Sequence, residues 1–264
     1  NGVWVVGDND TIVNSTLSYD IHGVLVNGPD NSFIGDRFKV GDLLLMGPYY
    51  EVVANDTVNG RPLVYLYNAS NVTVSDAGEV IAVYSRGLMV VGVNVSRATV
   101  GVMLWGVNDS VIEDVVASGN YLTGIYVIGD NDTIVNSTVS YNVLYGVYVY
   151  GDNYSIVNST VSYNVFGIYV IGDNDTIVNS TMSGNDLYGV NITGSYDSVI
   201  NSTVSYGIYG IALYDDSGTL ITGNIISNNA WCGLFMQGSS GDLIYNNLFN
   251  NTVNVCIEGG FAYW

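Results

Sequence analysis

Residues 124–145 read GIYVIGDNDTIVNSTVSYNVLY, and residues 146–166 read GVYVYGDNYSIVNSTVSYNVF. Nearly the same text returns at residues 167–188 and at residues 2–22. Degenerate copies begin at Gly101, Gly189, Gly210 and Gly233. The chain is therefore a tandem repeat with a period of about 21–23 residues.

Each copy opens with a glycine, after which aliphatic residues alternate with variable ones. The second position carries Val3, Val102, Ile125, Val147, Ile168, Val190, Ile211 and Leu234. The fourth carries Val5, Leu104, Val127, Val149, Val170, Ile192, Leu213 and Met236. A period of two predicts a short strand with these positions facing a core. A G-D-N-D turn then leads to further strands.

A second and a third strand are expected in every repeat. The second places Ile12, Val111, Ile134, Ile156, Ile177, Val199 and Leu243 in one inward column, a column being the equivalent residues of successive repeats. The third strand does the same with Leu17, Val116, Val139, Val161, Met182, Val204 and Leu248. Asn142, Asn164 and Asn185 recur after it and predict a hydrogen-bonded asparagine ladder.

Three short strands cannot pair within one repeat, so each must pair with the same strand of the repeats above and below, about 4.8 Å away. The sequence thus predicts an all-β fold, a parallel β-helix or β-solenoid with three sheets. We expect residues 1–264 to form one domain, with first coils at 1–35, an irregular insertion at 36–79 and regular coils at 80–264.

The charge of the chain restricts its partners. Five Lys and Arg residues stand against 24 Asp and Glu residues, a net charge of −19. Such a surface repels phosphate backbones and anionic lipid, so we expect no nucleic-acid partner. No apolar run reaches the length of a membrane span. The sequence starts at Asn1 rather than Met, from which we expect a mature chain whose leader has been removed.

Glycosylation sequons and a pair of cysteines are features that this chain shares with secreted proteins. N-x-S/T sequons suggest N-linked glycans at Asn9, Asn55, Asn68, Asn94, Asn108, Asn131, Asn153, Asn174, Asn191 and Asn250. A repeat rich in Asn, Ser and Thr also generates sequons by itself. Cys232 and Cys256 lie about one repeat apart, which is within disulfide reach if they share a column. We therefore expect an extracellular or cell-surface location.

The repeated G-[IV]-x-[VLI] openings and N-x-T-[IV] second strands resemble the right-handed parallel β-helix repeat family. The segments NGRPLVYLYN at 59–68 and SNVTVSDAG at 70–78 are most similar to archaeal NosD-like surface or secreted proteins. The resemblance implies a right-handed helix of single-stranded coils. The copper binding of that family label is not expected here, because the chain has one His, His22, and its five Met are scattered.

Enzymatic chemistry finds little support in the residues. Lyases of the family resemble one another in using an Arg or Lys base, and no Arg or Lys follows residue 97. Asp215 and Asp216 form an adjacent acid pair in the regular coils, which we interpret as a solvated turn. We therefore expect that the chain is not an enzyme, with a polysaccharide lyase or hydrolase as the remaining alternative.

Two kinds of side chain recur at the coil surface. Aspartates recur in the stacked turns, and we interpret them as a hydrated acidic edge. The alternative is a Ca²⁺ site whose candidate ligands are Asp8, Asp130, Asp132, Asp152, Asp173 and Asp175. Outward aromatics form a stripe of Trp105, Tyr126, Tyr148, Tyr150 and Tyr169. Such a stripe either stacks on sugars or on another protein, or packs from coil to coil.

The first repeat has no preceding cap, and the final segment is apolar and aromatic. Open ends of this kind favour head-to-tail contacts between copies of the chain. The residues concerned are Val3, Trp4, Val5, Ile257, Phe261, Tyr263 and Trp264. The sequence thus predicts a secreted, N-glycosylated structural solenoid that assembles into an extracellular filament or surface layer. The alternative is a carbohydrate-binding or adhesive module. No cofactor is expected beyond the glycans and the Ca²⁺ alternative.

Overall fold

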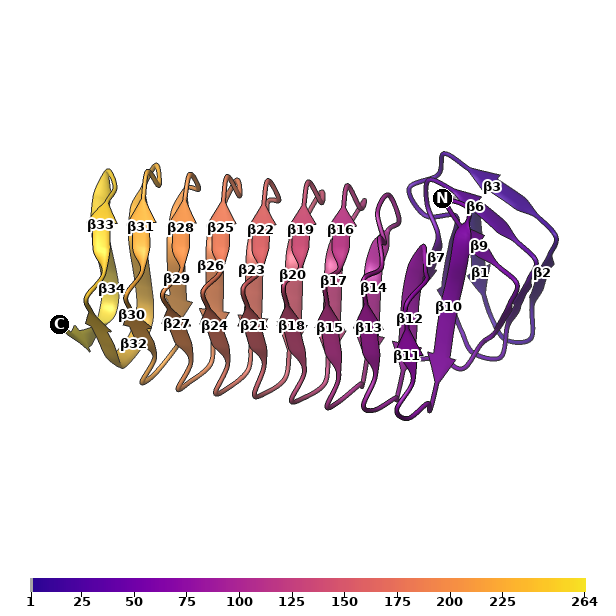
Figure 1. Cartoon of the computed structure of the whole chain (residues 1–264), viewed down its shortest axis with the longest axis horizontal. Helices are drawn as coiled ribbons and strands as arrows, with labels where there is room; N and C mark the ends of the chain where they lie inside the picture. Colours follow the sequence, from indigo (N-terminus) through magenta and orange to yellow (C-terminus); the bar gives the residue numbers. More distant parts are fainter. Residues whose placement is uncertain (1) are drawn as a thin grey trace.

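A computed structural model describes residues 2–264, and every regular element in this part of the chain is a β-strand. The strands are stacked in about twelve coils, which confirms the predicted β-solenoid. Most coils lie side by side along one axis, whereas the first coils form a block set at an angle at one end (Figure 1). We call residues 3–58 the N-terminal stack and residues 61–263 the main solenoid.

The N-terminal stack has three coils of three strands each. Its first sheet contains β1 (Val3–Val6), β4 (Val24–Asn27) and β7 (Leu43–Leu45). Its second contains β2 (Thr11–Val13), β5 (Ser32–Ile34) and β8 (Val52–Ala54). Its third contains β3 (Thr16–Ser18), β6 (Arg37–Lys39) and β9 (Thr57–Val58). All these pairings are parallel and join equivalent positions of successive coils.

The main solenoid has three long faces. Face one contains β10 (Arg61–Tyr67), β12 (Glu79–Val83), β14 (Val100–Trp105), β17 (Thr123–Ile128), β20 (Tyr145–Tyr150), β23 (Phe166–Ile171), β26 (Tyr188–Thr193), β29 (Tyr209–Tyr214), β32 (Cys232–Tyr245) and β34 (Val253–Tyr263). Face two contains β11 (Thr73–Val74), β13 (Met89–Val91), β15 (Val111–Glu113), β18 (Thr133–Val135), β21 (Ser155–Val157), β24 (Thr176–Val178), β27 (Ser198–Ile200), β30 (Leu220–Thr222) and the second half of β32. Face three contains β16 (Val116–Ser118), β19 (Thr138–Ser140), β22 (Thr160–Ser162), β25 (Thr181–Ser183), β28 (Thr203–Ser205), β31 (Ile225–Ser227) and β33 (Leu248–Asn250).

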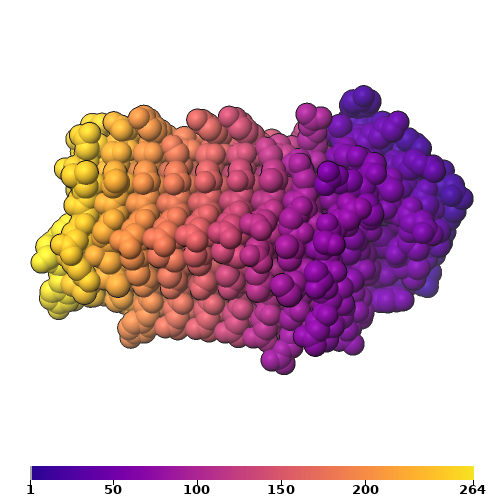
Figure 2. Space-filling model, viewed as in Figure 1, coloured from indigo at the N-terminus to yellow at the C-terminus, as the bar shows by residue number. Residues whose placement is uncertain are grey.

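The alternation read from the sequence sets the core. Ile125, Val147 and Ile168 are paired in register and buried, as are the residues two positions later. The glycine that opens each repeat lies against the next coil, so that a Cβ at Gly146 would overlap with the Gly167 carbonyl and the Val161 side chain. The space-filling view shows the result as straight rows of side chains running across the coils (Figure 2).

In the degenerate coils the predicted inward residues are wrong by one position. Ile112 and Ile244 occupy the column of Ile134, and Val111 and Leu243 do not. Ala117 and Phe249 similarly replace Val116 and Leu248 on face three. A one-residue shift turns every side chain to the opposite surface, so these strands can be assigned only from their pairing.

The segment predicted as an irregular insertion, residues 36–79, is largely regular. Strands β6 to β9 complete the N-terminal stack, and β10 begins face one. The departure from the solenoid is the antiparallel pairing of β9 with β10, which reverses the chain at Asn59 and Gly60. This hairpin separates the N-terminal stack from the main solenoid.

The N-terminal stack packs sideways on the main solenoid. Outward-facing Ile81 and Val83 of β12 and Met103 of β14 are buried in one cluster with Leu43 and Leu44 of β7. The third coil of the N-terminal stack therefore rests on the outer surface of face one. A cavity of about 210 Å³ remains in this junction, bordered by Trp105 and Tyr126.

Candidate functional site

Aromatic rings stack along the outer surface of face one. Tyr126, Tyr148 and Tyr169 occupy one column of β17, β20 and β23. Their ring centroids are 5.1 and 5.5 Å apart, and the ring planes differ by 9° and 8°. Met103 occupies this column in β14, and the ring of Trp105, two residues further along β14, lies 6.0 Å from that of Tyr126. Parallel register imposes this spacing, because each ring repeats at the distance between neighbouring coils.

A second ladder runs beside the first and was missed by the sequence analysis. It consists of Tyr145, Phe166, Tyr188, Tyr209 and Trp231, with centroids 4.9 to 5.7 Å apart. Four of these rings stand directly before the glycine that opens a repeat. From the sequence alone this position falls at the end of the preceding repeat, whereas its side chain lies on the outer surface of face one.

The first ladder ends after Tyr169, and a hollow begins there. The next two residues of its column are Asn191 and Ala212, which carry no ring. The hollow has a volume of about 480 Å³. We call it the aromatic hollow and define it by Phe166, Tyr169, Tyr188, Asn191, Thr193, Tyr214 and Asp215.

Asn191 lies at the base of this hollow with an incomplete set of hydrogen bonds. Its side chain is 4% exposed, and its Oδ1 has no partner among the residues that the structure describes. Above it, the hydroxyls of Tyr188 and Tyr214 are hydrogen bonded to each other at 2.7 Å. A buried amide oxygen without a donor is costly, so a ligand hydroxyl that reached it after a shift of the covering rings would be stabilised.

Burial favours the neutral form of several tyrosines on face one. Burial raises the pKa of Tyr126 to about 12 and raises the pKa of Tyr148 and Tyr214 above the ordinary value. Neighbouring tyrosines contribute to the same direction because two adjacent phenolates repel each other. The surface therefore offers rings and hydroxyls, without charge from these groups. Tyr150 lies apart from both ladders, exposed beside the acidic turns.

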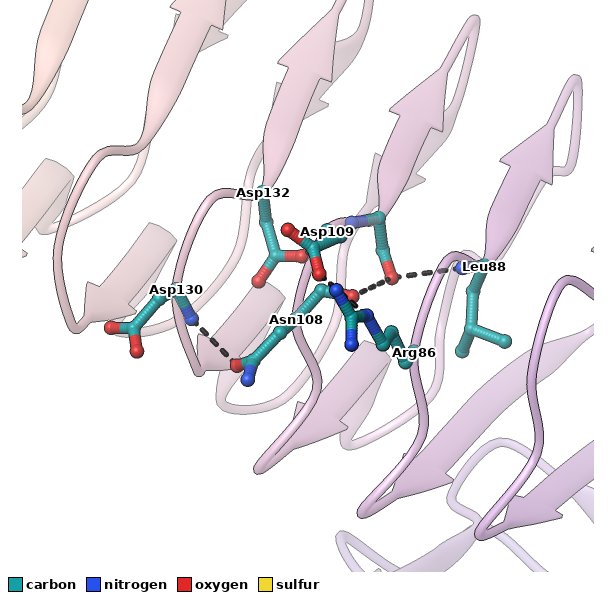
Figure 3. A network of polar contacts seen from close by, with 7 residues as sticks. Arg86, Leu88, Asn108, Asp109, Asp130 and Asp132 are labelled. Carbon is teal, nitrogen blue, oxygen red and sulfur yellow. Dashed lines mark hydrogen bonds and ion pairs between the residues drawn. The ribbon is translucent and has the colours of Figure 1, made fainter.

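The predicted acid columns lie on opposite sides of the backbone. Asp130, Asp152 and Asp173 are exposed, and the Oδ1 of each accepts an N–H from the next coil at 2.8–2.9 Å. Asn108 begins this outer series by accepting from the Asp130 N–H, as Figure 3 shows. Asp132 and Asp175 instead point inward and are buried.

These acids do not converge on one point. Across residues 2–264, no group of three or more His, Cys, Asp or Glu side chains is arranged to hold a metal ion. The acid pair is also divided, since Asp215 borders the aromatic hollow and Asp216 is buried, with the Thr219 hydroxyl donating to it. The interpretation of both as a solvated turn is therefore wrong for Asp216. Asp8 is exposed in the N-terminal stack, remote in sequence from the other acids.

The sequons fall into two groups. Asn9, Asn55, Asn68, Asn94, Asn108, Asn131, Asn153, Asn174 and Asn250 are exposed. Asn191 is buried in β26, so a glycan there is incompatible with the folded chain. Asn191 and Thr193 of this sequon face outward from β26, but neighbouring aromatic rings cover the Asn191 side chain.

Cys232 and Cys256 form a disulfide between β32 and β34, with their Cα atoms 6.1 Å apart. They stand in different columns of neighbouring coils, because Cys232 pairs with Val253 and Cys256 pairs with Phe235. The bond joins the last two coils of face one.

The residues proposed for assembly are mostly exposed at the two ends. Trp4 and Trp264 are each 63% exposed, and Val3, Ile257, Phe261 and Tyr263 are also exposed. Val5 is buried in the first coil. Within residues 2–264 there is no helix of the length and apolarity that a bilayer crossing requires.

Two family models match the chain. The model described as "right handed beta helix region" matches residues 100–209, and that described as "periplasmic copper-binding protein (NosD)" matches residues 167–264. These matches confirm the resemblance to the right-handed parallel β-helix repeat family. No curated protein matches this β-helix.

Several solved structures are similar to this β-helix. The A-module of the Azotobacter vinelandii mannuronan C-5 epimerase AlgE4 is 14% identical, with a TM-score of 0.64 over 97% of this chain and 91% of that chain. The A-module of AlgE6 is 14% identical with a TM-score of 0.53 over the same shares. The enzymatically active domain of bacteriophage CBA120 tailspike protein 2 is 12% identical with a TM-score of 0.54, over 97% of this chain and 42% of that chain.

The expectation that this β-helix is not an enzyme is contradicted by these comparisons. The similar structures include two epimerase modules and a domain named as enzymatically active. That expectation rested on the missing Arg or Lys base, a requirement taken from one class of the family. At these identities the similarity shows the fold alone.

The donor atoms do not fit the copper binding named in the family model. In the matched residues 167–264, Met182 and Met236 are buried in the apolar core and both cysteines are in the disulfide. His22 lies in the N-terminal stack, where its Nδ1 is 3.2 Å from the Thr99 hydroxyl oxygen. Copper sites need clustered soft or imidazole ligands, and these residues are dispersed.

Proposed function

We propose that this β-helix is a carbohydrate-active protein that binds a sugar chain across the aromatic hollow. The observation that carries the proposal is the Asn191 amide, buried and without a partner for Oδ1 beneath a wall of stacked rings. Ring faces pack against the C–H surfaces of sugars, and an amide oxygen accepts from a sugar hydroxyl. The similar mannuronan epimerase modules support a carbohydrate ligand.

The charge around the hollow favours an uncharged sugar. Asp215 borders it, and no Lys or Arg follows residue 97 in the sequence. A carboxylate of an acidic sugar would meet negative charge without a compensating cation. We therefore propose a neutral polysaccharide as the ligand, and a location outside the cytoplasm in keeping with the periplasmic family description.

Calorimetric titration with neutral hexasaccharides of glucose, mannose and xylose tests the proposal. We expect Tyr188→Ala to weaken binding by roughly tenfold or more, since it removes a ring wall and the bond to Tyr214. Asn191→Ala should weaken binding to a similar extent. Tyr163→Ala is the matched control, because Tyr163 is an exposed ring outside the hollow.

Turnover is measured on the same samples by mass spectrometry after long incubation. Shortened or unsaturated products that disappear in Tyr188→Ala would assign an enzymatic activity to the hollow. Unchanged affinity in both hollow variants, or an equal loss in Tyr163→Ala, would contradict the proposal.

Head-to-tail assembly remains a second candidate function. It is supported by the exposed aromatic side chains of the first and last coils, Trp4 at one end and Phe261 and Trp264 at the other. We expect electron microscopy of the purified chain to show filaments, and Trp4→Ser to shorten them. Uniform single rods at high protein concentration would contradict this candidate.

A further inference from the structure

A hollow lies at the hairpin between the N-terminal stack and the main solenoid. Its volume is about 580 Å³, within the range of small-ligand sites. Arg61 of β10 and Arg97 of the coil before β16 line it, together with Asn94, Ser96 and Ser118. It opens at the end of face three, where the coil before β16 has an isolated bridge in place of a third strand.

Both guanidinium groups are available to a ligand. Among residues 2–264 one ion pair is present, between Arg86 and Asp109 at 2.8 Å, and it lies on the outer turns shown in Figure 3. Arg61 and Arg97 thus lack a carboxylate partner in a chain of net charge −19. These two unpaired cations make the electrostatic potential in the hollow positive, whereas the overall charge of the protein is negative.

Hydrogen bonds hold the frame of this hollow across the hairpin. Asn59 Nδ2 donates to the backbone carbonyls of Ser96 and Arg97, at 3.1 and 3.3 Å. The Ser96 hydroxyl donates to Asn94 Oδ1 at 2.6 Å and accepts the Ser118 N–H at 3.2 Å. Asn94 is thereby oriented with its Nδ2 left as a donor. The polar groups left free around the hollow are mainly hydrogen-bond donors.

We propose that this hollow is an anion site that binds the carboxylate, sulfate or phosphate group of a sugar-sized ligand. Guanidinium groups bind such oxyanions through paired N–H donors, and the Asn94 amide adds a further donor. The volume accommodates a monosaccharide as well as its charged group. The anion site is separate from the aromatic hollow, and neither proposal depends on the other.

The experiment is a titration of the full chain, produced in a host without N-glycosylation so that the Asn94 sequon is free. The probes are D-glucuronate, glucose 6-phosphate, inorganic sulfate and uncharged D-glucose, followed by ¹H–¹⁵N NMR or calorimetry. We expect saturable binding of the charged probes, weakened by salt, and none of D-glucose. Whichever of glucuronate and glucose 6-phosphate binds with the higher affinity identifies the preferred oxyanion, carboxylate or phosphate.

Arg61→Gln and Arg97→Gln should each weaken the binding of the charged probes by about tenfold or more. Arg37→Gln is the matched control, since it removes one exposed positive charge of the N-terminal stack from outside the hollow. Equal melting temperatures would show that all three variants are folded. An equal loss in Arg37→Gln, or absence of saturable binding to every charged probe, would overturn the proposal.

Discussion

Several aspartate side chains are buried inside the turns that precede the second strand of a coil. Asp132, Asp175 and Asp197 precede the second strand of their coils. The Oδ1 of each accepts a backbone N–H from the preceding coil at 2.7 Å; the donors are Ser110, Tyr154 and Asp175, respectively. The other oxygen of each is buried without a partner among the described residues. Burial raises the pKa of Asp132 and Asp197 to about 7 and that of Asp175 to about 8.

Two residues at the equivalent position indicate what the second oxygen does. Asn31 Nδ2 donates to the Gly28 carbonyl at 2.9 Å, and the Tyr154 hydroxyl donates to the Gly129 carbonyl at 2.7 Å. The position therefore favours a donor toward the turn glycine. A neutral carboxylic acid supplies that donor, whereas a carboxylate does not.

Stability should accordingly fall as pH rises. The unfolded chain releases the Asp175 proton near pH 4, whereas the folded chain keeps it until about pH 8. The stabilising contribution is complete below pH 4 and is lost between about pH 4 and 8. We expect Asp175→Asn to be more stable than wild type at pH 9 by on the order of 1–2 kcal/mol and similar at pH 4, measured by guanidinium unfolding.

The matched control is Asp173→Asn, which removes one carboxylate from the exposed outer series two residues away. It should change the pH dependence much less than Asp175→Asn does, because the Asp173 charge is the smallest of the contributions that raise the pKa of Asp175. A wild-type unfolding free energy that rises from pH 4 to pH 9 would refute the assignment of neutral acids.

At the scale of the strand and its turn, polar ladders hold the coils in register. The predicted asparagine ladder is present: the Asn142 N–H donates to Asn164 Oδ1 at 2.9 Å, and the Asn164 N–H donates to Asn185 Oδ1 at 3.1 Å. Asn164 Oδ1 also accepts from Asn142 Nδ2. Such a ladder satisfies buried N–H groups in a corner where the strands are interrupted.

A serine ladder in another corner was not predicted. The N–H groups of Ser137, Ser159 and Ser180 each donate to the serine hydroxyl one coil further on, at 3.1–3.2 Å. The asparagines before these serines are exposed and have positive φ angles, 51° at Asn136 and 50° at Asn158. Asparagine tolerates this left-handed conformation, which turns the following serine inward.

At the scale of the whole molecule, one buried polar cluster joins the N-terminal stack to the main solenoid. Asp42 of the N-terminal stack accepts from the backbone N–H groups of Thr99 and Val100 of the main solenoid, at 2.5 and 3.2 Å. The Thr99 hydroxyl donates back to the Ile21 carbonyl at 2.7 Å. Burial raises the pKa of Asp42 to about 6 and that of the adjoining Glu79 well above its ordinary value.

Removing this cluster should loosen the N-terminal stack selectively. Asp42→Ala leaves two buried N–H groups without acceptors, a cost of about 2–3 kcal/mol. We expect hydrogen exchange, followed by mass spectrometry, to accelerate at least tenfold in residues 3–58 and to stay unchanged in residues 124–227.

Asp8→Ala serves as the control, because it removes an exposed carboxylate of the same N-terminal stack. It should change neither region. Equal acceleration along the whole chain in Asp42→Ala would show instead that the two parts unfold as one unit.

The coils, the three faces and most of the core could be predicted from the amino-acid sequence, because the two-residue alternation and the 21–23-residue period are local and repeat many times. The sequence also indicated the aromatic stripe. The structure was needed to show the sideways packing at Ile81 and Met103, the hollow at Asn191 and the position of Arg61 and Arg97 around one cavity. Each of these depends on places where the repeat is interrupted, and there the position of a side chain is set by contacts between distant segments that no local period encodes.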